Sequence, residues 1–233
     1  MYEEKIIPPK KAMPQAQDGT LRKFALRVPE VIYQCSGIMV FGKRIKSLVF
    51  STDLSIIKNV NADAIIAVYP FTPQPIITQA LLLAADIPVF AGVGGGLTKG
   101  QRVVNLAMFA EMQGATGVVL NAPTANAVVQ HVAETIDIPV VLTVARADTD
   151  FEARLQSGAN IFNVSAAAET PAVVRSIRER YPDVPIIATG GPTDESILET
   201  IQAGANAITW TPPSNGEIFR DIMAAYRDNK PHP

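Results

Sequence analysis

The stretch from Ile186 to Ser214 reads IIATGGPTDESILETIQAGANAITWTPPS. It contains an apolar strand, the turn Thr189-Gly190-Gly191-Pro192, a helix that opens with two acidic residues, and the phrase Gly204-Ala205-Asn206 before a second strand at 207–211. This order is that of one βα unit leading into the next parallel strand. It places two glycines and a hydroxyl-rich turn at neighbouring strand ends.

The same alternation of short β-branched runs and helical stretches extends back through the chain. It predicts strands at 45–51, 64–69, 88–93, 117–122, 139–145, 160–165, 185–189 and 207–211. Eight such strands with helices between them are typical of a closed (βα)8 (TIM) barrel, which needs about 250 residues, and the chain has 233. We therefore predict one α/β barrel over residues 45–228, with a short tail at 229–233.

The first 44 residues do not fit a βα unit, and we expect them to form an N-terminal arm. Within it, residues 31–41 alternate enough to indicate an extra strand or a hairpin around Cys35 and Gly37. Two interpretations stay open for the arm. It either is solvated or plugs the barrel floor, which we favour, or it reaches a neighbouring subunit as a strap.

Composition narrows the classes of partner. Hydrophobic residues make up 48% and charged residues 18%, as expected where parallel strands are buried on both faces and helix surfaces meet in a homo-oligomer. A net charge of -2 gives no general reason to expect nucleic acid or an anionic membrane. Without a run of roughly 20 apolar residues or a secretory start, we expect a cytoplasmic protein.

Four helices are predicted to begin at hydroxyl side chains, which accept hydrogen bonds from the first turn. The predicted pairs are Thr98 with Gln101, Thr149 with Glu152, Thr170 with Pro171, and Ser214 with Glu217.

Polar side chains interrupt the apolar strands near their carboxyl ends, where a barrel binds its ligand. Unpaired polar atoms buried under helices would cost about 1 to 3 kcal/mol each, so we expect these side chains to point inward. The resulting ring of candidate substrate-binding residues is Ser51, Tyr69, Asn121, Thr143, Asn163, Ser165, Thr189 and Thr209, with Asp53, Arg146 and Asp148 just above.

Asp53 is the first candidate for a general acid or base, because it directly follows the first barrel strand and a partly dry mouth can raise a carboxylate pKa. The alternative is that Asp53 only caps the helix that starts at Leu54. Asp148 is the second candidate and has the same alternative, a cap for the helix that contains Phe151. Arg146 has forked donors suited to a phosphate or carboxylate, or it lies unpaired on the surface.

The run Gly94-Gly95-Gly96 predicts either a mobile lid or a close approach of backbone to ligand, because only glycine lacks a Cβ. Lys99 follows it as a flexible cation over the same mouth.

The sequence lacks the residues that several kinds of catalytic and metal site require. The histidines are His131, in a predicted helix, and His232, in the tail, so histidine metal sites and serine–histidine triads are not expected. The lone cysteine, Cys35, excludes an internal disulfide and a cysteine-rich metal site. No lysine falls at an inward strand position near the top, which disfavours a Schiff-base aldolase. We predict no metal site.

The segments IIATGG at 186–191 and AGANA at 203–207 resemble the last quarter of the phosphate-binding (βα)8 barrels, specifically over about 184–211. These include the ribulose-phosphate-binding, thiamin-phosphate synthase-like and inosine-monophosphate-dehydrogenase-like barrels. The resemblance implies a phosphate held near Gly190, Gly191 and the loop after the last strand, aided by a helix N-terminus. The candidate phosphate ligands are Thr189, Gly190, Gly191, Thr211 and Ser214.

This sequence departs from the pattern at two points. Pro212 and Pro213 supply no N–H donors, and Asp194 and Glu195 repel an anion at the start of their helix.

Three functional hypotheses follow. The first is a lyase or isomerase of a small phosphorylated metabolite that uses carboxylate acid–base catalysis and no cofactor. The second is an oxidoreductase barrel that binds flavin (FMN) or a nucleotide through the same glycine turn. The third is a non-catalytic ligand-binding or assembly barrel, consistent with a mostly neutral ring.

Overall fold

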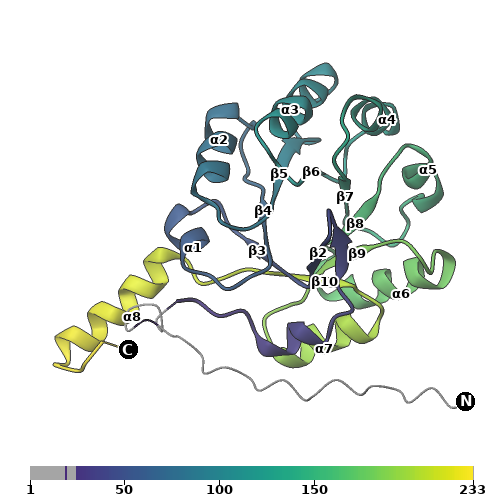
Figure 1. Cartoon of the computed structure of the whole chain (residues 1–233). Helices are drawn as coiled ribbons and strands as arrows, with labels where there is room; N and C mark the ends of the chain where they lie inside the picture. The colour runs from purple at the N-terminus through teal and green to yellow at the C-terminus, as the bar shows by residue number, and fades with distance from the viewer. Residues whose placement is uncertain (1–18, 20–24, 233) are drawn as a thin grey trace, which may run out of the picture.

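A computed structural model of the chain describes Gly19 and residues 25–232. Its eight parallel strands close into a barrel in the order β10-β3-β4-β5-β6-β7-β8-β9. Helices follow the strands and surround them (Figure 1). The predicted α/β (βα)8 barrel is confirmed.

The strands lie where the β-branched runs predicted them, and only β5 extends beyond its predicted span, by one residue. They are β3 (Ser47–Phe50), β4 (Ala64–Ala67), β5 (Val89–Gly94), β6 (Gly117–Leu120), β7 (Val140–Val144), β8 (Ile161–Val164), β9 (Ile186–Thr189) and β10 (Ala207–Trp210). The α-helices are α1 (Leu54–Lys58), α2 (Pro75–Ala84), α3 (Gln101–Met112), α4 (Asn126–Thr135), α5 (Phe151–Gln156), α6 (Thr170–Arg180), α7 (Asp194–Gln202) and α8 (Asn215–Arg227). None of the helices in the described residues is long and apolar enough to cross a membrane.

Two apolar clusters stabilise the barrel, one inside the ring of strands and one between the strands and the helices. The inner cluster fills the barrel axis and includes Leu48, Phe90 and Ile161. The outer cluster packs neighbouring strand residues such as Val49 against the helices. Because side chains alternate along a strand, burial on both sides explains the nearly continuous apolar runs in the sequence.

A two-stranded hairpin closes the amino-terminal end of the barrel. It consists of β1 (Ile38–Val40) and β2 (Lys43–Ile45), joined by a two-residue turn in which Phe41 and Gly42 have φ values of 45° and 78°. Positive φ at both positions is the geometry of a tight hairpin turn. Ile38, Val40 and Ile45 are buried in the inner cluster, so the hairpin forms the floor of the barrel.

The segment before the hairpin packs on the outside of the same barrel. Val28, Ile32 and Cys35 are buried in the outer cluster, and the 3-10 helix η2 (Glu30–Gln34) lies against α7 (Figure 1). The described part of the arm therefore covers its own barrel. Residues 1–18 and 20–24 lie outside the described residues.

Three of the four predicted caps are wrong. Gly100 precedes α3 in place of Thr98, Asp150 caps α5 in place of Thr149, and Glu169 precedes Thr170, which is itself the first residue of α6. Thr98 and Thr149 take part in the preceding loops instead: the Thr98 carbonyl accepts from Gly95 N–H, and the Thr149 hydroxyl donates to the Arg146 carbonyl.

The fourth predicted cap is confirmed. Ser214 and Glu217 form a reciprocal capping box at α8. Thr193 and Ser196 form a second one at α7.

Gly117 offers a direct test of the barrel packing. A Cβ there would lie 2.6 Å from the Phe90 ring and 3.1 Å from the carbonyl oxygen of Pro139. We expect Gly117→Ala to lower the free energy of unfolding by about 1 to 3 kcal/mol, the usual cost of overpacking. Urea unfolding measures it, with Gly216→Ala in the open first turn of α8 as a control that should not destabilise. An unchanged midpoint for Gly117→Ala would contradict this packing.

Candidate functional site

The carboxyl ends of the strands surround a cavity of about 590 Å³, which we call the mouth cavity. It lies where β3, β4, β6 and β10 end. Its lining includes the predicted site residues Ser51, Tyr69, Asn121, Thr211 and Ser214, together with Asp53. The mouth cavity therefore brings together six of the residues that the sequence assigned to a site.

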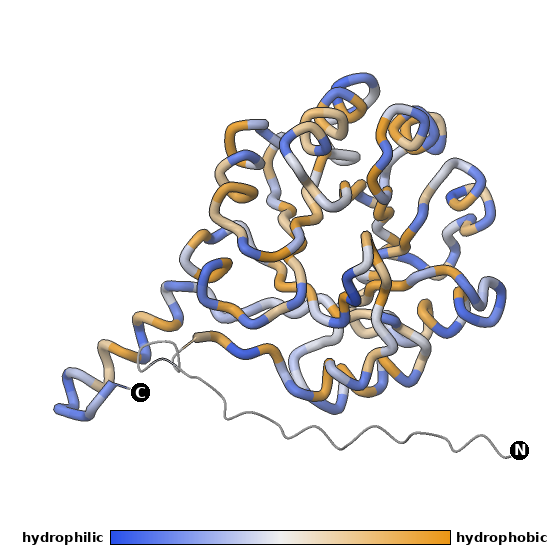
Figure 2. Tube along the Cα trace, in the orientation of Figure 1, coloured by the Kyte–Doolittle hydropathy of each residue, from blue (hydrophilic) through white to orange (hydrophobic). Residues whose placement is uncertain are grey.

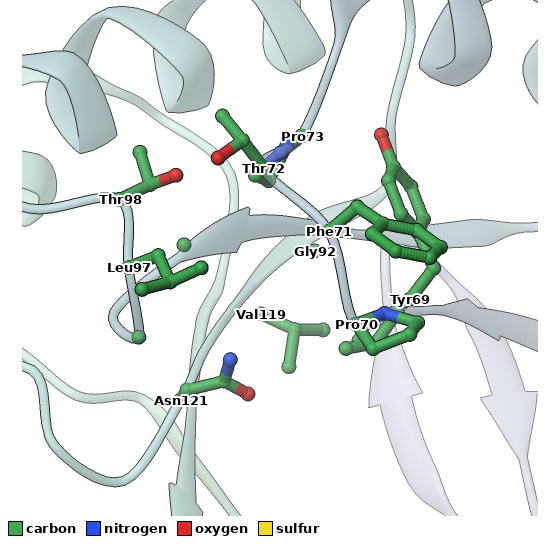
Figure 3. A pocket seen from close by; sticks show the side chains of 13 residues that line it. Tyr69, Pro70, Phe71, Thr72, Pro73, Gly92, Leu97, Thr98, Val119 and Asn121 are labelled. Carbon is green, nitrogen blue, oxygen red and sulfur yellow. The ribbon is translucent and has the colours of Figure 1, made fainter.

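A smaller recess of about 90 Å³ continues from the mouth cavity toward β5, and the two share Tyr69 and Asn121. Figure 3 shows the Asn121 amide beside Val119 at one side of the recess, with the rings of Tyr69, Pro70 and Phe71 opposite. Within the described chain the Asn121 side chain makes no hydrogen bond. Its amide is therefore available to a ligand.

A third cavity, of about 350 Å³, lies at the ends of β9 and β10, and we call it the threonine cavity. Thr189, Thr209 and Thr211 line it together with Gly191 and Asp194. Thr211 also lines the mouth cavity, so the two cavities adjoin at this residue.

Asp53 is the N-cap of α1. Its Oδ1 accepts hydrogen bonds from the Ser55 N–H at 2.8 Å and the Ser55 hydroxyl at 2.7 Å, and its Oδ2 accepts from Asn215 Nδ2 at 2.5 Å. The bond from the Ser55 hydroxyl is the largest cause that lowers the carboxyl pKa, and burial opposes it. The predicted increase of this pKa is therefore wrong, because donors outweigh desolvation. Asp53 is an ionised cap in the wall of the mouth cavity.

Tyr69 also lines the mouth cavity. The backbone N–H of Gln74 donates to its oxygen at 2.8 Å, which leaves the hydroxyl proton available to a ligand. Ser51 is held locally, since its Oγ accepts from the Asp53 N–H at 3.1 Å.

Six of the eight predicted ring residues have the inward register. Asn121, Thr143, Asn163, Thr189 and Thr209 each stand two positions after an inner-cluster residue, and Ser165 continues the series past the end of β8, where it is exposed. Ser51 and Tyr69 have the opposite register, and they reach the mouth because both lie beyond the ends of their strands.

Several buried polar atoms near the mouth have no hydrogen-bond partner. They are Asn163 Oδ1, Thr209 Oγ1 and Thr98 Oγ1. The Asn163 amide nitrogen donates to Thr143 Oγ1 at 3.3 Å, so its oxygen alone is left unpaired. Because such atoms cost free energy when unpaired, a ligand or water that donates to them would be bound favourably.

Arg146 and Asp148 lie apart from the mouth cavity. They form an exposed bidentate pair with distances of 2.8 and 2.7 Å, and the hydrogen bond from Arg146 lowers the Asp148 pKa. Arg146 lines a separate cavity between the loops after β6 and β7. Asp148 lines neither the mouth cavity nor the threonine cavity.

The glycine run forms part of the wall of the recess, which Gly94 and Gly96 line. Gly95 N–H donates to the Thr98 carbonyl at 3.0 Å, and the Gly94 carbonyl accepts from Asn121 N–H at 2.9 Å. A Cβ at Gly95 would lie only 2.0 Å from Thr124 Oγ1. The close approach that requires glycine here is to the next loop of the protein.

The two glycines after β9 have different environments. A Cβ at buried Gly190 would lie 2.7 Å from Ile197 and 2.8 Å from Ile208, so Gly190 allows α7 to pack on the strands. Gly191 has a φ of 84° and lines the threonine cavity. Of the pair, only Gly191 is placed to contact a ligand there.

The sequence did not single out all of the site. Thr98 was interpreted only as a cap, and Phe71 and Thr72 in the recess were not considered. The proline-rich loop 70–75 directly after a strand was the available signal for them.

Within residues 25–232 no three His, Cys, Asp or Glu side chains cluster as metal ligands would.

The cap role of Asp53 predicts an acid-dependent stability. Since its folded-state pKa lies below the ordinary value of 3.8, the ionised carboxylate stabilises the fold above that pH, and the contribution is lost as the pH falls through the lower value. We expect Asp53→Asn to be less stable than the natural chain at pH 6 and the difference to shrink toward pH 3. Urea unfolding across this range measures it, and a difference independent of pH would contradict it.

No family model matches the sequence, and no curated protein matches it. Solved structures do share its architecture. A candidate phosphonomutase from Burkholderia cenocepacia J2315 has a TM-score of 0.62 and 15% identity, over 78% of this chain and 92% of that one. Phosphonopyruvate hydrolase in complex with oxalate and Mg²⁺ has a TM-score of 0.59 and 13% identity, over 80% and 84%.

2,3-Dimethylmalate lyase, described as a member of the PEP mutase/isocitrate lyase superfamily, has a TM-score of 0.58 and 11% identity, over 90% of this chain and 84% of that one. At these identities the likeness establishes the fold. This chain is similar in architecture to TIM-barrel enzymes of lyase, mutase and hydrolase type.

Proposed function

We propose that this protein is a barrel enzyme of lyase or isomerase type, and that its small phosphorylated substrate extends across the mouth cavity and the threonine cavity. The observation that carries the proposal is the junction of the two cavities at Thr211, beside the buried and unpaired Thr209 hydroxyl. One ligand can occupy both spaces. Its phosphate would lie at β9–β10 and its reacting carbon near β3, β4 and β6.

The phosphate end is supported by neutral donors. Three threonines, Gly191 and Asp194 at the amino terminus of α7 line one space, and backbone donors at helix N-termini are common phosphate ligands. Asp194 lines the same cavity and opposes an anion. Since no lysine or arginine lines this cavity, we expect weak, millimolar-range affinity for phosphate alone.

The reacting end combines one anion with two neutral donors. Asp53 would accept a proton from the substrate carbon, and the electron pair would pass to an adjacent carbonyl oxygen. Tyr69 and Asn121 would donate hydrogen bonds to that oxygen as its negative charge develops. In an isomerase the proton would return from Asp53 to the former carbonyl carbon, while the hydroxyl proton of the neighbouring carbon moves to the former carbonyl oxygen. In a lyase the enolate would expel a leaving group from the next carbon as the carbonyl re-forms and a C=C bond is made, and Asp53 would give the proton to that leaving group.

The saturated hydrogen bonding of Asp53 supports a second candidate, a non-catalytic ligand-binding barrel. With a lowered pKa and both oxygens accepting hydrogen bonds, Asp53 is a weak base. In this candidate the same cavities bind the same ligand, but no proton is exchanged. Native mass spectrometry of the purified protein would identify a co-purified ligand, including a flavin, in either case.

Asp53→Asn removes the carboxylate base but keeps a side-chain oxygen that can cap α1, so the variant should stay folded although it is less stable at neutral pH. With the chain incubated in D2O and a panel of small phosphorylated ketones and aldehydes, we expect carbon–hydrogen exchange by NMR, reduced at least about 100-fold by Asp53→Asn.

The matched control is Asp150→Asn, which alters the N-cap of α5, whose side chain accepts from Ala153 N–H. It should leave the exchange rate unchanged. Exchange that survives Asp53→Asn would remove Asp53 from catalysis, while ligand binding without exchange would favour the non-catalytic candidate.

Thr209→Val tests the phosphate end. Removing an unpaired buried hydroxyl should leave the free energy of unfolding unchanged or higher, while the dissociation constant for inorganic phosphate should rise about tenfold through loss of one hydrogen bond. Isothermal titration measures the constant. Thr200→Val, whose hydroxyl already donates to the Ser196 carbonyl, should destabilise the fold without changing phosphate affinity. Equal phosphate affinity in Thr209→Val and the natural chain would refute the phosphate site.

A further inference from the structure

The last helix leaves the barrel. In a (βα)8 barrel the helix after the final strand ordinarily packs back on the sheet, but among residues 25–232 no helix or strand packs along α8 and none of its residues is buried. Figure 1 shows α8 projecting away from the other helices beyond α1. Its start is fixed, since the Asn215 amide donates to Asp53 and to Ser55 Oγ at 2.5 and 2.7 Å.

The helix is nevertheless strongly amphipathic. Phe219, Met223 and Tyr226 follow one another at spacings of four and three residues and are 64%, 42% and 49% exposed. Ile218 and Ile222 lie beside this row, whereas the charged residues occupy the opposite side of the helix. An exposed apolar row of this kind marks a surface that is covered by a partner.

A second apolar row lies on the barrel itself. The helix α2 contains no charged residue, and its exposed side carries Ile76, Ala80 and Leu83. Figure 2 shows apolar colouring along most of α2. Neighbouring α3 adds Phe109 and Met112, which are also exposed. A helix without charged residues is ordinarily buried over most of its surface, so this exposed side of α2 also lacks its partner.

The structure assigns both rows to one interface: we infer that the protein forms a two-fold dimer in which α8 of each copy docks on the α2–α3 surface of the other. The rows match in length, since seven residues of helix separate Phe219 from Tyr226 and Ile76 from Leu83, about 10 Å in each case. A two-fold axis satisfies both surfaces of both copies and leaves no open end.

Area and charge favour a second copy over other occupants. The two rows contribute five large side chains, and Phe109 and Met112 of α3 bring the number to seven. At about 100 Å² each they approach the roughly 800 Å² per partner of a stable interface. The charges of α8 balance, with Arg220 and Arg227 against Glu217 and Asp221. Helices that bind anionic membrane surfaces are rich in lysine and arginine on their polar side, so α8 does not match them.

Sedimentation of the full chain tests the assembly. A monomer has a mass of 25.0 kDa, and we expect about twice that at micromolar concentration. Met223→Asp on α8 and Leu83→Asp on α2 should each weaken the dimer about thirty-fold or more, with unchanged circular dichroism because both positions are exposed. Arg220→Glu, on the charged side of α8, is the matched control and should leave the mass unchanged.

Cross-linking between copies tests the pairing directly. The natural chain has one cysteine, Cys35, which is buried and whose pKa burial raises to about 12, so it should not react. A Met223→Cys chain mixed with a tagged Leu83→Cys chain and a short bis-maleimide should give a covalent heterodimer. An Arg220→Cys chain in place of Met223→Cys should not.

Three outcomes would overturn the inference. They are a monomeric natural chain, a dimer that both aspartate variants leave intact, or equal cross-linking from the two sides of α8. Vesicle binding by a monomeric chain would likewise replace the second copy with a membrane surface.

Discussion

Closure of the eight strands constrains every other feature of this molecule. In a closed parallel barrel each strand residue faces either the axis or the helices, and the two directions alternate along the strand, interrupted here by an irregularity between Gly92 and Gly94 of β5. On β10, Ala207 lies in the inner cluster, Ile208 lies in the outer cluster, and Thr209 faces inward at the mouth. One periodicity thus provides apolar side chains along the barrel axis and hydrogen-bonding groups at the mouth, so that the inner cluster and the site come from the same strands.

The same periodicity explains which parts of the fold and of the site the sequence predicts. β-branched runs located each strand because burial on both faces leaves a strong local signal, and alternation then placed Asn121, Asn163 and Thr209 inward. Alternation does not place Ser51 and Tyr69, because both lie beyond the ends of their strands, where the direction of the backbone decides the position of the side chain. The direction of the Asp53 pKa was also missed, because the hydrogen bond from the Ser55 hydroxyl lowers it most, and Asn215, 162 residues away in the sequence, adds a further donor.

Local signals were equally limited at helix starts. Thr98 and Thr149 have the residue type of a cap, but loop hydrogen bonds hold both of them before the helix begins, and Asp150 takes the cap of α5. Choosing between neighbouring acceptors requires the loop geometry, which is set by packing.

The outward course of α8 also depends on residues far away in the sequence. Part of the outer wall near α7 is covered by Val28 and Ile32 from the arm, and no pattern within residues 215–227 contains that information.

Shared residues and hydrogen bonds connect the mouth cavity to α8, so ligand binding can be coupled to the docking of α8. Thr211 borders both cavities, Ser214 caps α8, and Asn215 joins the first turn of α8 to Asp53. If a ligand in the mouth cavity changes how firmly Asn215 is held, it changes the orientation of the helix that we infer to dock on a second copy. Linkage then requires that dimerisation alter ligand affinity by the same factor. A ligand confined to the threonine cavity, without differential contact to Asn215, would produce no such coupling.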